Sequence, residues 1–466
     1  MVQLTQSMRP QKLSIRPNRL LRLQWLRRGR FVQTHIRDSL SVHTANVNIA
    51  EPYQFIPPRK GTFVSSCLKP FLPWYMRKTW GVVDQEIRGA EKLSASLAAG
   101  HGVVLAPNHV RECDALTVGF LAIKCQCYLN IMASWHVFKG SWFQSFMIRQ
   151  VGAFSVHREG MDKTSLNTAI EILTGAKRPL VLFPEGYCAF HNDILNPLQE
   201  GISLIVQRAA RKREESGGQV VVHPVAIKYQ YAGSSEETLG RMLAGLEQRL
   251  GLNVQNQLSL LDRLRQFGAE LLSLREVEYF GKAQSGELFE RQERLIEHLL
   301  QPIEAQWDRP GEGCDVYERV KALRTALLRK LVDGNPDAAT KKQCWRQLSD
   351  CMFALRLKSF PADYLKESPC VERLLETVER FENDIDNNIP TRPYRVVIEV
   401  GDALPVSPQR DRKGLGIMQK IGVSLNEMLN RLATECNQPL PKQDCDAGSV
   451  AVESPEPIRP SAGISA

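Results

Sequence analysis

The sequence of 466 residues lacks a long apolar run, and this argues against a membrane-spanning helix. A helix that crosses a bilayer needs roughly 18 or more consecutive apolar residues. The most apolar stretches, such as VVLAP at 103 to 107, have only the length of a strand. The eleven cysteines include no CxxC pair and no spacing typical of a zinc site. The sequence therefore predicts a protein without a disulfide framework or a metal, in a reducing compartment such as the cytoplasm.

Acidic residues are scarce at the amino end. Residues 1 to 40 contain eight Arg and one Lys against one Asp, a charge of +8 out of the total of +9. Leu20, Leu21, Leu23, Trp25 and Leu26 alternate with arginines there, which favours a bilayer interface, while a disordered leader is the equal alternative. Because the other 426 residues are nearly neutral, nucleic-acid binding is not expected.

From Gly102 to Tyr231 short β-rich runs alternate with stretches of helical periodicity. We expect strands at residues 103–107, 128–134, 152–157, 179–184 and 219–229. Pro224 interrupts the last of these runs, and this predicts an edge strand or a bulge. The alternation is typical of an α/β fold in which helices cover a sheet.

After Tyr231 about 150 residues have helical periodicity, and then one strand pattern returns at 394 to 406, followed by a helix near 414 to 435. Because one strand cannot stand alone, we expect it to rejoin the first sheet, which makes the helical stretch an insertion. The predicted organisation is a basic tail (1–45), an α/β domain (46–231), a helical insertion (232–391), a return strand and helix (392–436) and a disordered tail (437–466).

Asn108, His109 and Asp114 follow a predicted buried strand, at the mouth of a helix, where α/β folds commonly build sites. A histidine has a reference pKa of about 6.5 and can accept a proton near neutral pH. A carboxylate bonded to its other ring nitrogen fixes the tautomer. Alone, this HxxxxD pattern is weak, since a surface histidine and a helix-capping aspartate would give the same letters.

Four blocks occur in order: NHVRECD at 108–114, GAFSVHR at 152–158, FPEG at 183–186 and VVHPVAI at 221–227. Together they resemble the glycerolipid acyltransferases, the HxxxxD family whose best-known members are the 1-acyl-sn-glycerol-3-phosphate acyltransferases. The resemblance covers roughly residues 60–231, and residues 394–436 less closely, while the helical insertion has no recognisable motif.

The resemblance implies an acyltransferase of phospholipid biosynthesis with a mixed sheet covered by helices. It makes His109 the general base, Asp114 its partner and Glu185 a further catalytic residue. The substrate pocket would contain Asn108, Gly152, Phe154, Arg158, Phe183, Pro184 and Gly186. It further implies an acyl-CoA or acyl carrier protein thioester as donor, a lysolipid as acceptor and no metal or other cofactor. A peripheral position on the inner face of the membrane follows, for which aromatic residues at 63 to 80 offer an interfacial segment; the alternative is an ordinary packed helix.

Two departures from the family pattern concern the acceptor. Tyr187 and Cys188 follow FPEG where lysophosphatidate-using members usually continue EGTR, and His157 stands where an Asp is common. A candidate phosphate ligand is therefore missing, for which Arg111 offers one source of charge. Glycerol-3-phosphate or another lysolipid is an alternative acceptor, and an inactive membrane scaffold of the same fold is an alternative function.

Overall fold

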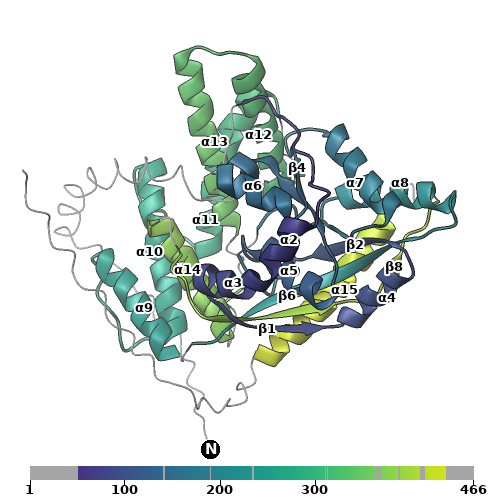
Figure 1. Cartoon of the computed structure of the whole chain (residues 1–466). Helices are drawn as coiled ribbons and strands as arrows, with labels where there is room; N and C mark the ends of the chain where they lie inside the picture. Colours follow the sequence, from purple (N-terminus) through teal and green to yellow (C-terminus); the bar gives the residue numbers. More distant parts are fainter. Residues whose placement is uncertain are drawn as a thin grey trace, which may run out of the picture.

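The computed structural model describes residues 51–139, 142–188, 190–233, 236–309, 311, 313–359, 364–365, 369–386, 389–409 and 415–436. One eight-stranded mixed sheet lies at its centre and helices cover it, which confirms the predicted α/β class (Figure 1). The tails predicted at 1–45 and 437–466 lie outside the described residues.

The strands are β1 (Val82–Arg88), β2 (Gly102–Pro107), β3 (Asn130–Ser134), β4 (Ala153–Val156), β5 (Leu180–Val181), β6 (Val220–Tyr231), β7 (Tyr394–Val400) and β8 (Leu404–Pro405). Their order is β1-β7-β6-β2-β5-β3-β4, and β8 pairs with β6. The run from β6 to β4 is parallel, whereas β7 and β8 are antiparallel to β6. The carboxyl ends of β2, β5, β3 and β4 therefore meet at one edge of the sheet.

Strand β7 returns to the sheet after the helical stretch and lies between β1 and β6. Its neighbour β1, with the sequence VVDQEIR, is a strand that the sequence analysis missed. Its central residues Asp84, Gln85 and Glu86 are polar and partly or fully exposed, since β1 is an edge strand, so no apolar alternation marks it.

Of the two alternatives predicted for Pro224, the edge strand is wrong, whereas the ladder is irregular there: the antiparallel register changes by one residue between the pairs Val222–Leu404 and Val225–Val400. β6 is an interior strand, and Pro224 pairs in register with Ala106 of β2. On the other side, Pro224 accepts a hydrogen bond from the Gly401 N–H, between the residues that pair with β8 and those that pair with β7. The N–H that proline lacks is therefore at the point where the antiparallel partner of β6 changes from β8 to β7.

The first face of the sheet is covered by α3 (Leu72–Trp80), α4 (Ala90–Ala98) and α5 (Asp114–Lys124), and the second by α7 (Lys163–Gly175), α8 (Gly201–Glu214) and α15 (Leu415–Cys436). Alternate side chains of β2 point to the two faces of the sheet. Leu105 belongs to the hydrophobic core on the first face, and Val104 belongs to the core on the second face. Before α3 lie α2 (Phe63–Leu68) and the short helix η1 (Lys69–Phe71), and η2 (Trp135–Lys139) with α6 (Trp142–Gln150) joins β3 to β4.

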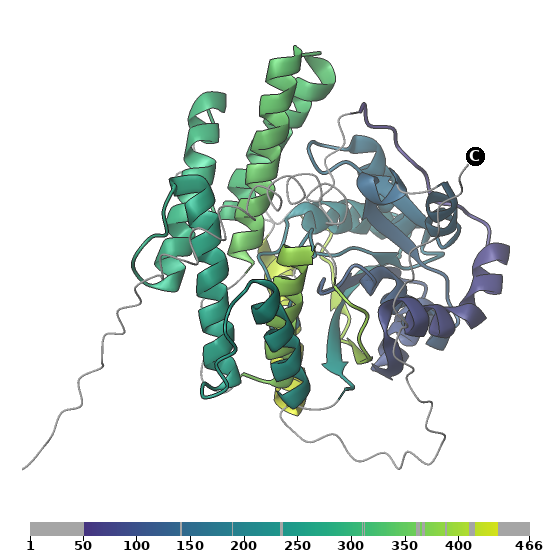
Figure 2. The same cartoon turned by 90° about the vertical axis from the view of Figure 1, so that its left-hand side faces the viewer.

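In the described residues between β6 and β7, six helices form two groups (Figure 2). The helices α9 (Glu236–Arg249), α10 (Leu260–Phe280) and α14 (Val371–Asp386) contribute Leu243, Phe267 and Val378 to the first core of the sheet. The helices α11 (Leu288–Trp307), α12 (Val316–Asp333) and α13 (Ala338–Lys358) enclose a core of their own. Half of the helical stretch is thus packed as part of the α/β body.

Candidate active site

His109 and Asp114 meet across the turn that joins β2 to α5. The distance from His109 Nδ1 to Asp114 Oδ2 is 2.9 Å, and the carboxylate is fully buried while 16% of the imidazole remains exposed. The Nε2 atom of the ring makes no hydrogen bond to another described residue. With its proton on Nδ1, the ring therefore offers the lone pair of Nε2 as a base.

Three further donors hold the Asp114 carboxylate. Oδ2 accepts the backbone N–H groups of Val110 at 2.6 Å and Arg111 at 2.9 Å, and Oδ1 accepts the hydroxyl of Tyr229 at 2.7 Å. The turn wraps around its own aspartate, so the spacing of five residues from His109 produces a fixed geometry. Tyr229, near the end of β6, is a supporting residue that the sequence analysis did not single out; it stood only as the last residue of the strand expected at 219–229.

Glu185 is buried and turns toward the backbone of His109 instead of its ring. Its Oε1 accepts the His109 N–H at 2.7 Å, and its Oε2 accepts the backbone N–H and the side-chain amide of Asn196 at 3.0 and 2.7 Å. Burial raises the pKa of this carboxyl to about 7. The geometry makes Glu185 a residue that positions the His109 loop.

The other residues of FPEG shape the same turn. The ring of Phe183 lies 4.3 Å from that of His109, centroid to centroid, and Pro184 accepts the Gln199 N–H through its carbonyl. Gly186 has a φ of +76°, and a Cβ there would come within 3.3 Å of the Tyr317 hydroxyl of α12. A side chain at this position would strain the turn and crowd the helix.

Two asparagine side chains extend the pairing of β6 beyond the end of β2. Asn108 donates its amide N–H to the Ile227 carbonyl at 3.0 Å and accepts the Ile227 N–H at 2.7 Å. Asn192 makes the equivalent pair with Tyr229, at 3.1 and 2.8 Å. One N–H and one lone pair of the Asn108 amide are used by the sheet, which leaves one N–H and one lone pair for the predicted role in binding substrate.

Comparison with known proteins agrees with this geometry. Residues 85–228 match the family model described as Acyltransferase. Residues 85–228 therefore form an acyltransferase domain, and the protein is an acyltransferase. The match runs from within β1 to within β6 and contains His109, Asp114, Arg158 and Glu185, while the helical insertion and β7 lie outside it. No curated protein matches the chain.

Acyl transfer to a glycerolipid-type acceptor is the activity of this family. Within the described ranges, the acyltransferase has no helix long and apolar enough to cross a membrane. In the same residues, no group of three His, Cys, Asp or Glu side chains is arranged to hold a metal ion.

Two residues of the second block lie away from the catalytic turn of the acyltransferase. Gly152 precedes β4, at the opposite edge of the sheet, where a Cβ would come 2.2 Å from the Leu129 carbonyl oxygen. Phe154 is fully buried in the second core. The structure thus places Gly152 at a close backbone approach and Phe154 in the core of the second face.

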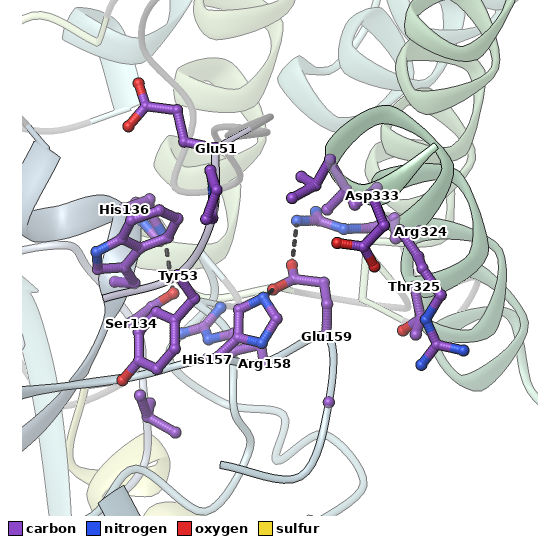
Figure 3. Close-up of a pocket in the computed structure, with 17 residues that line it drawn as sticks. Glu51, Tyr53, Ser134, His136, His157, Arg158, Glu159, Arg324, Thr325 and Asp333 are labelled. Carbon is purple, nitrogen blue, oxygen red and sulfur yellow. Dashed lines mark hydrogen bonds and ion pairs between the residues drawn. The ribbon is translucent and has the colours of Figure 1, made fainter. Parts of the chain in front are cut away.

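Arg158 and Arg111 have different surroundings. Arg158 follows β4 and lines a cavity between the ends of β3 and β4 and helix α12 (Figure 3). Arg111 instead forms an ion pair with Glu379 of α14 at 2.8 Å, and its guanidinium lies 4.1 Å from the ring centroid of Tyr394. Because that charge is already neutralised, Arg111 is a structural residue and does not replace the missing phosphate ligand.

Proposed function

We propose that the enzyme transfers a fatty acyl group from an acyl-CoA or acyl carrier protein thioester to 1-acyl-sn-glycerol-3-phosphate, in phospholipid biosynthesis. The observation that carries this proposal is the His109–Asp114 pair, in which one ring nitrogen is held by a buried carboxylate and the other is unoccupied. Glycerol-3-phosphate and other lysolipids are the alternative acceptors.

In the reaction, the acceptor hydroxyl attacks the carbonyl carbon of the thioester while His109 Nε2 removes its proton. The tetrahedral oxyanion then collapses and breaks the C–S bond, and the departing thiolate takes the proton from the imidazolium. Asp114 stabilises the imidazolium and keeps the ring in one orientation. General-base catalysis of this kind contributes about 10²- to 10⁴-fold, and positioning of the substrates must supply the rest.

The test is acyl transfer from labelled palmitoyl-CoA to a panel of lysolipids and glycerol-3-phosphate. We expect His109→Ala to lower kcat by about 10²- to 10⁴-fold. His101→Ala, at the amino end of β2, is the matched control and should retain activity. If the wild-type enzyme is inactive with acyl-CoA, acyl carrier protein thioesters are tried next, and inactivity with both donors and every acceptor would contradict the proposal.

The same proposal places the enzyme on the cytoplasmic face of a membrane. Phe63, Phe71 and Trp74 of α2, η1 and α3 are 80%, 64% and 60% exposed, and Trp142 of α6 is 80% exposed. The helices α2 and α6 touch, since the Ser65 hydroxyl donates to the Gln150 carbonyl at 2.6 Å. Exposed aromatic side chains beside basic residues suit the interface of an anionic bilayer.

Co-sedimentation with anionic phosphatidylglycerol vesicles tests this placement. The double variant Phe71→Ala/Trp74→Ala should bind vesicles several-fold more weakly, whereas Trp345→Ala, an exposed tryptophan on α13, should bind as the wild type does. Release by salt alone would indicate a charge-driven attachment through the basic tail, and equal binding by all variants would exclude the aromatic surface.

A further inference from the structure

A cavity of about 380 Å³ lies between the strand ends and the helical insertion (Figure 3). One wall follows β3 and β4, and the other is α12, with Ser134, His136, Arg158, Glu159, Arg324 and Leu328 among the lining residues. The strand ends belong to the edge of the sheet at which His109 follows β2. A volume of this size suits a small polar group and the start of its chain.

Arg158 lines this cavity without a partner of its own. It forms no hydrogen bond or ion pair with another described residue, and burial together with the nearby Arg324 guanidinium lowers its pKa. A part-buried guanidinium with unused donors is costly unless an anion joins it. Its planar fork suits two oxygens of a phosphate or carboxylate group.

A second guanidinium reaches the cavity from α12. Arg324 Nη2 lies 2.9 Å from Glu159 Oε1, and both side chains are largely buried, with 12% and 18% exposed. His136 remains neutral because burial, with the two arginines nearby, lowers its pKa to about 3. Among the partly buried groups of the lining, two guanidiniums accompany the one carboxylate of Glu159, while Glu51, Arg329 and Asp333 line the cavity from exposed positions.

The residues that follow FPEG contact both α12 and the loop of His109. Tyr187 stacks on Tyr317 of α12, with ring centroids 4.6 Å apart. Cys188 donates its S–H to the Val110 carbonyl at 3.2 Å, next to His109 in the chain. Tyr317 and Cys188 also lie near enough to Arg158 to act electrostatically on its pKa. Residues 187–188 therefore link the catalytic turn to the surroundings of Arg158.

We propose that Arg158 and Arg324 jointly bind a phosphomonoester of a substrate in this cavity, so that α12 of the helical insertion determines which substrates the acyltransferase accepts. The new element is Arg324, which lies outside the four blocks. This inference rests on the proposed function. Two substrates could supply the phosphate, namely the glycerophosphate headgroup of the acceptor and the 3′-phosphate of coenzyme A.

The test compares the full chain with its Arg324→Gln variant in two kinds of measurement. In titration calorimetry we expect binding of sn-glycerol 3-phosphate, or of coenzyme A, to weaken about tenfold or more. In kinetics the KM for the phosphate-bearing substrate should rise by a similar factor while kcat changes little. Two analogues show which phosphate is bound: monoacylglycerol replaces the lysophosphatidate, and acyl-dephospho-CoA replaces acyl-CoA. With the analogue that lacks the bound phosphate, the wild type and Arg324→Gln should have the same KM.

Two control variants separate binding from structure. Lys330→Gln removes the same charge from an exposed position of α12 and should leave KM unchanged. The double variant Arg324→Gln/Glu159→Gln removes the ion pair without leaving an unpaired buried carboxylate. If Arg324 has a purely structural role, KM in the double variant should return to the wild-type value. If Arg324 binds phosphate, KM should stay as high as in Arg324→Gln. Wild-type affinity and KM in Arg324→Gln, or recovery in the double variant, would overturn the inference. If the wild type transfers no acyl group at all, the proposed function fails, while calorimetry still decides whether the cavity binds phosphate.

Discussion

The catalytic turn and the helical insertion are stabilised in different ways. In the turn, Asp114 contacts residues three to five positions away, and its bonds to Val110 and Arg111 go to the backbone. The insertion makes its contacts through long side chains over long separations, as in the pair of Glu379 with Arg111. A short motif can encode the first kind of site, whereas only the assembled fold brings the second kind together.

The two regions are nevertheless connected. Arg380 of α14 donates to the Phe190 carbonyl at 3.0 Å, and the Phe190 N–H donates to the Val110 carbonyl at 3.1 Å. Glu376 of the same helix accepts the Asn192 N–H at 3.2 Å. Helix α14 therefore supports the loop that borders His109, so the insertion contributes hydrogen bonds to the structure of the site.

The largest effect on kcat is expected from Asp114→Asn, which disrupts the local hydrogen bonds of the turn. The amide NH₂ would face the donors of Val110 and Arg111, or the His109 ring, and we expect kcat to fall by about 10²- to 10⁴-fold. Asp337→Asn is the control, since Asp337 only caps α13 by accepting the Thr340 N–H and asparagine caps equally well. Steady-state kinetics with the best acceptor would measure both, and equal rates for the two variants would remove Asp114 from the mechanism.

Next comes Glu379→Gln, which breaks the long-range support. It leaves the guanidinium of Arg111, which is 16% exposed, without its ion pair, and we expect the free energy of unfolding to drop by about 3 to 5 kcal/mol. Glu290→Gln, in the exposed pair with Arg294 at 4.0 Å, should change it by less than about 1 kcal/mol. Urea unfolding measures both, and equal changes would mean that α14 does not stabilise the site through this pair.

A smaller effect should follow from Tyr229→Phe, which removes one hydroxyl from Asp114. A hydrogen bond to a charged group contributes about 1.5 to 3 kcal/mol, so we expect kcat to fall roughly tenfold. Tyr231→Phe is the matched control, because the Tyr231 hydroxyl makes no hydrogen bond to the described residues. An unchanged kcat in Tyr229→Phe would show that the two backbone donors suffice.

The smallest expected effect is on the pH dependence of the free energy of unfolding. Burial raises the pKa of Glu185 in the turn and of Glu376 in α14 to about 7 from 4.5, so each folded carboxyl holds its proton more tightly than the unfolded chain does. The stability that each contributes is present below pH 4.5 and is lost as pH rises through 7. Urea unfolding between pH 5 and 8 should show a smaller loss of stability in Glu185→Gln and in Glu376→Gln than in the wild type. Glu290→Gln should follow the wild type, and parallel curves for all four proteins would contradict these pKa values.

Much of the sheet could be predicted from the sequence because its interior strands are continuous apolar runs. The helix expected to begin near Asp114 is α5, and the predicted meeting of His109 with Asp114 is present. Strand β1 was missed because a polar edge strand lacks such a run. The division into domains remains a prediction, although α9, α10 and α14 share the core of the sheet.

The remainder of the site depends on residues that no short pattern joins. Asn192 and Glu379 lie far along the chain from His109, and Arg324 stands in a helix whose periodicity predicts only packing. Gly152 and Phe154 show that a family block also contains residues that serve the backbone and the core. Asn196, which holds Glu185, lies eleven positions away with no motif of its own.

The position of β7 has a consequence for synthesis of the chain. Because β7 lies between β1 and β6, both neighbours keep an unpaired edge until residues 394–400 have left the ribosome. The helices between β6 and β7 must be translated first, which takes roughly 10 to 30 s at bacterial and eukaryotic rates. During that interval the nascent chain presents open strand edges to other chains, so the enzyme is a natural client for chaperones that act on the ribosome.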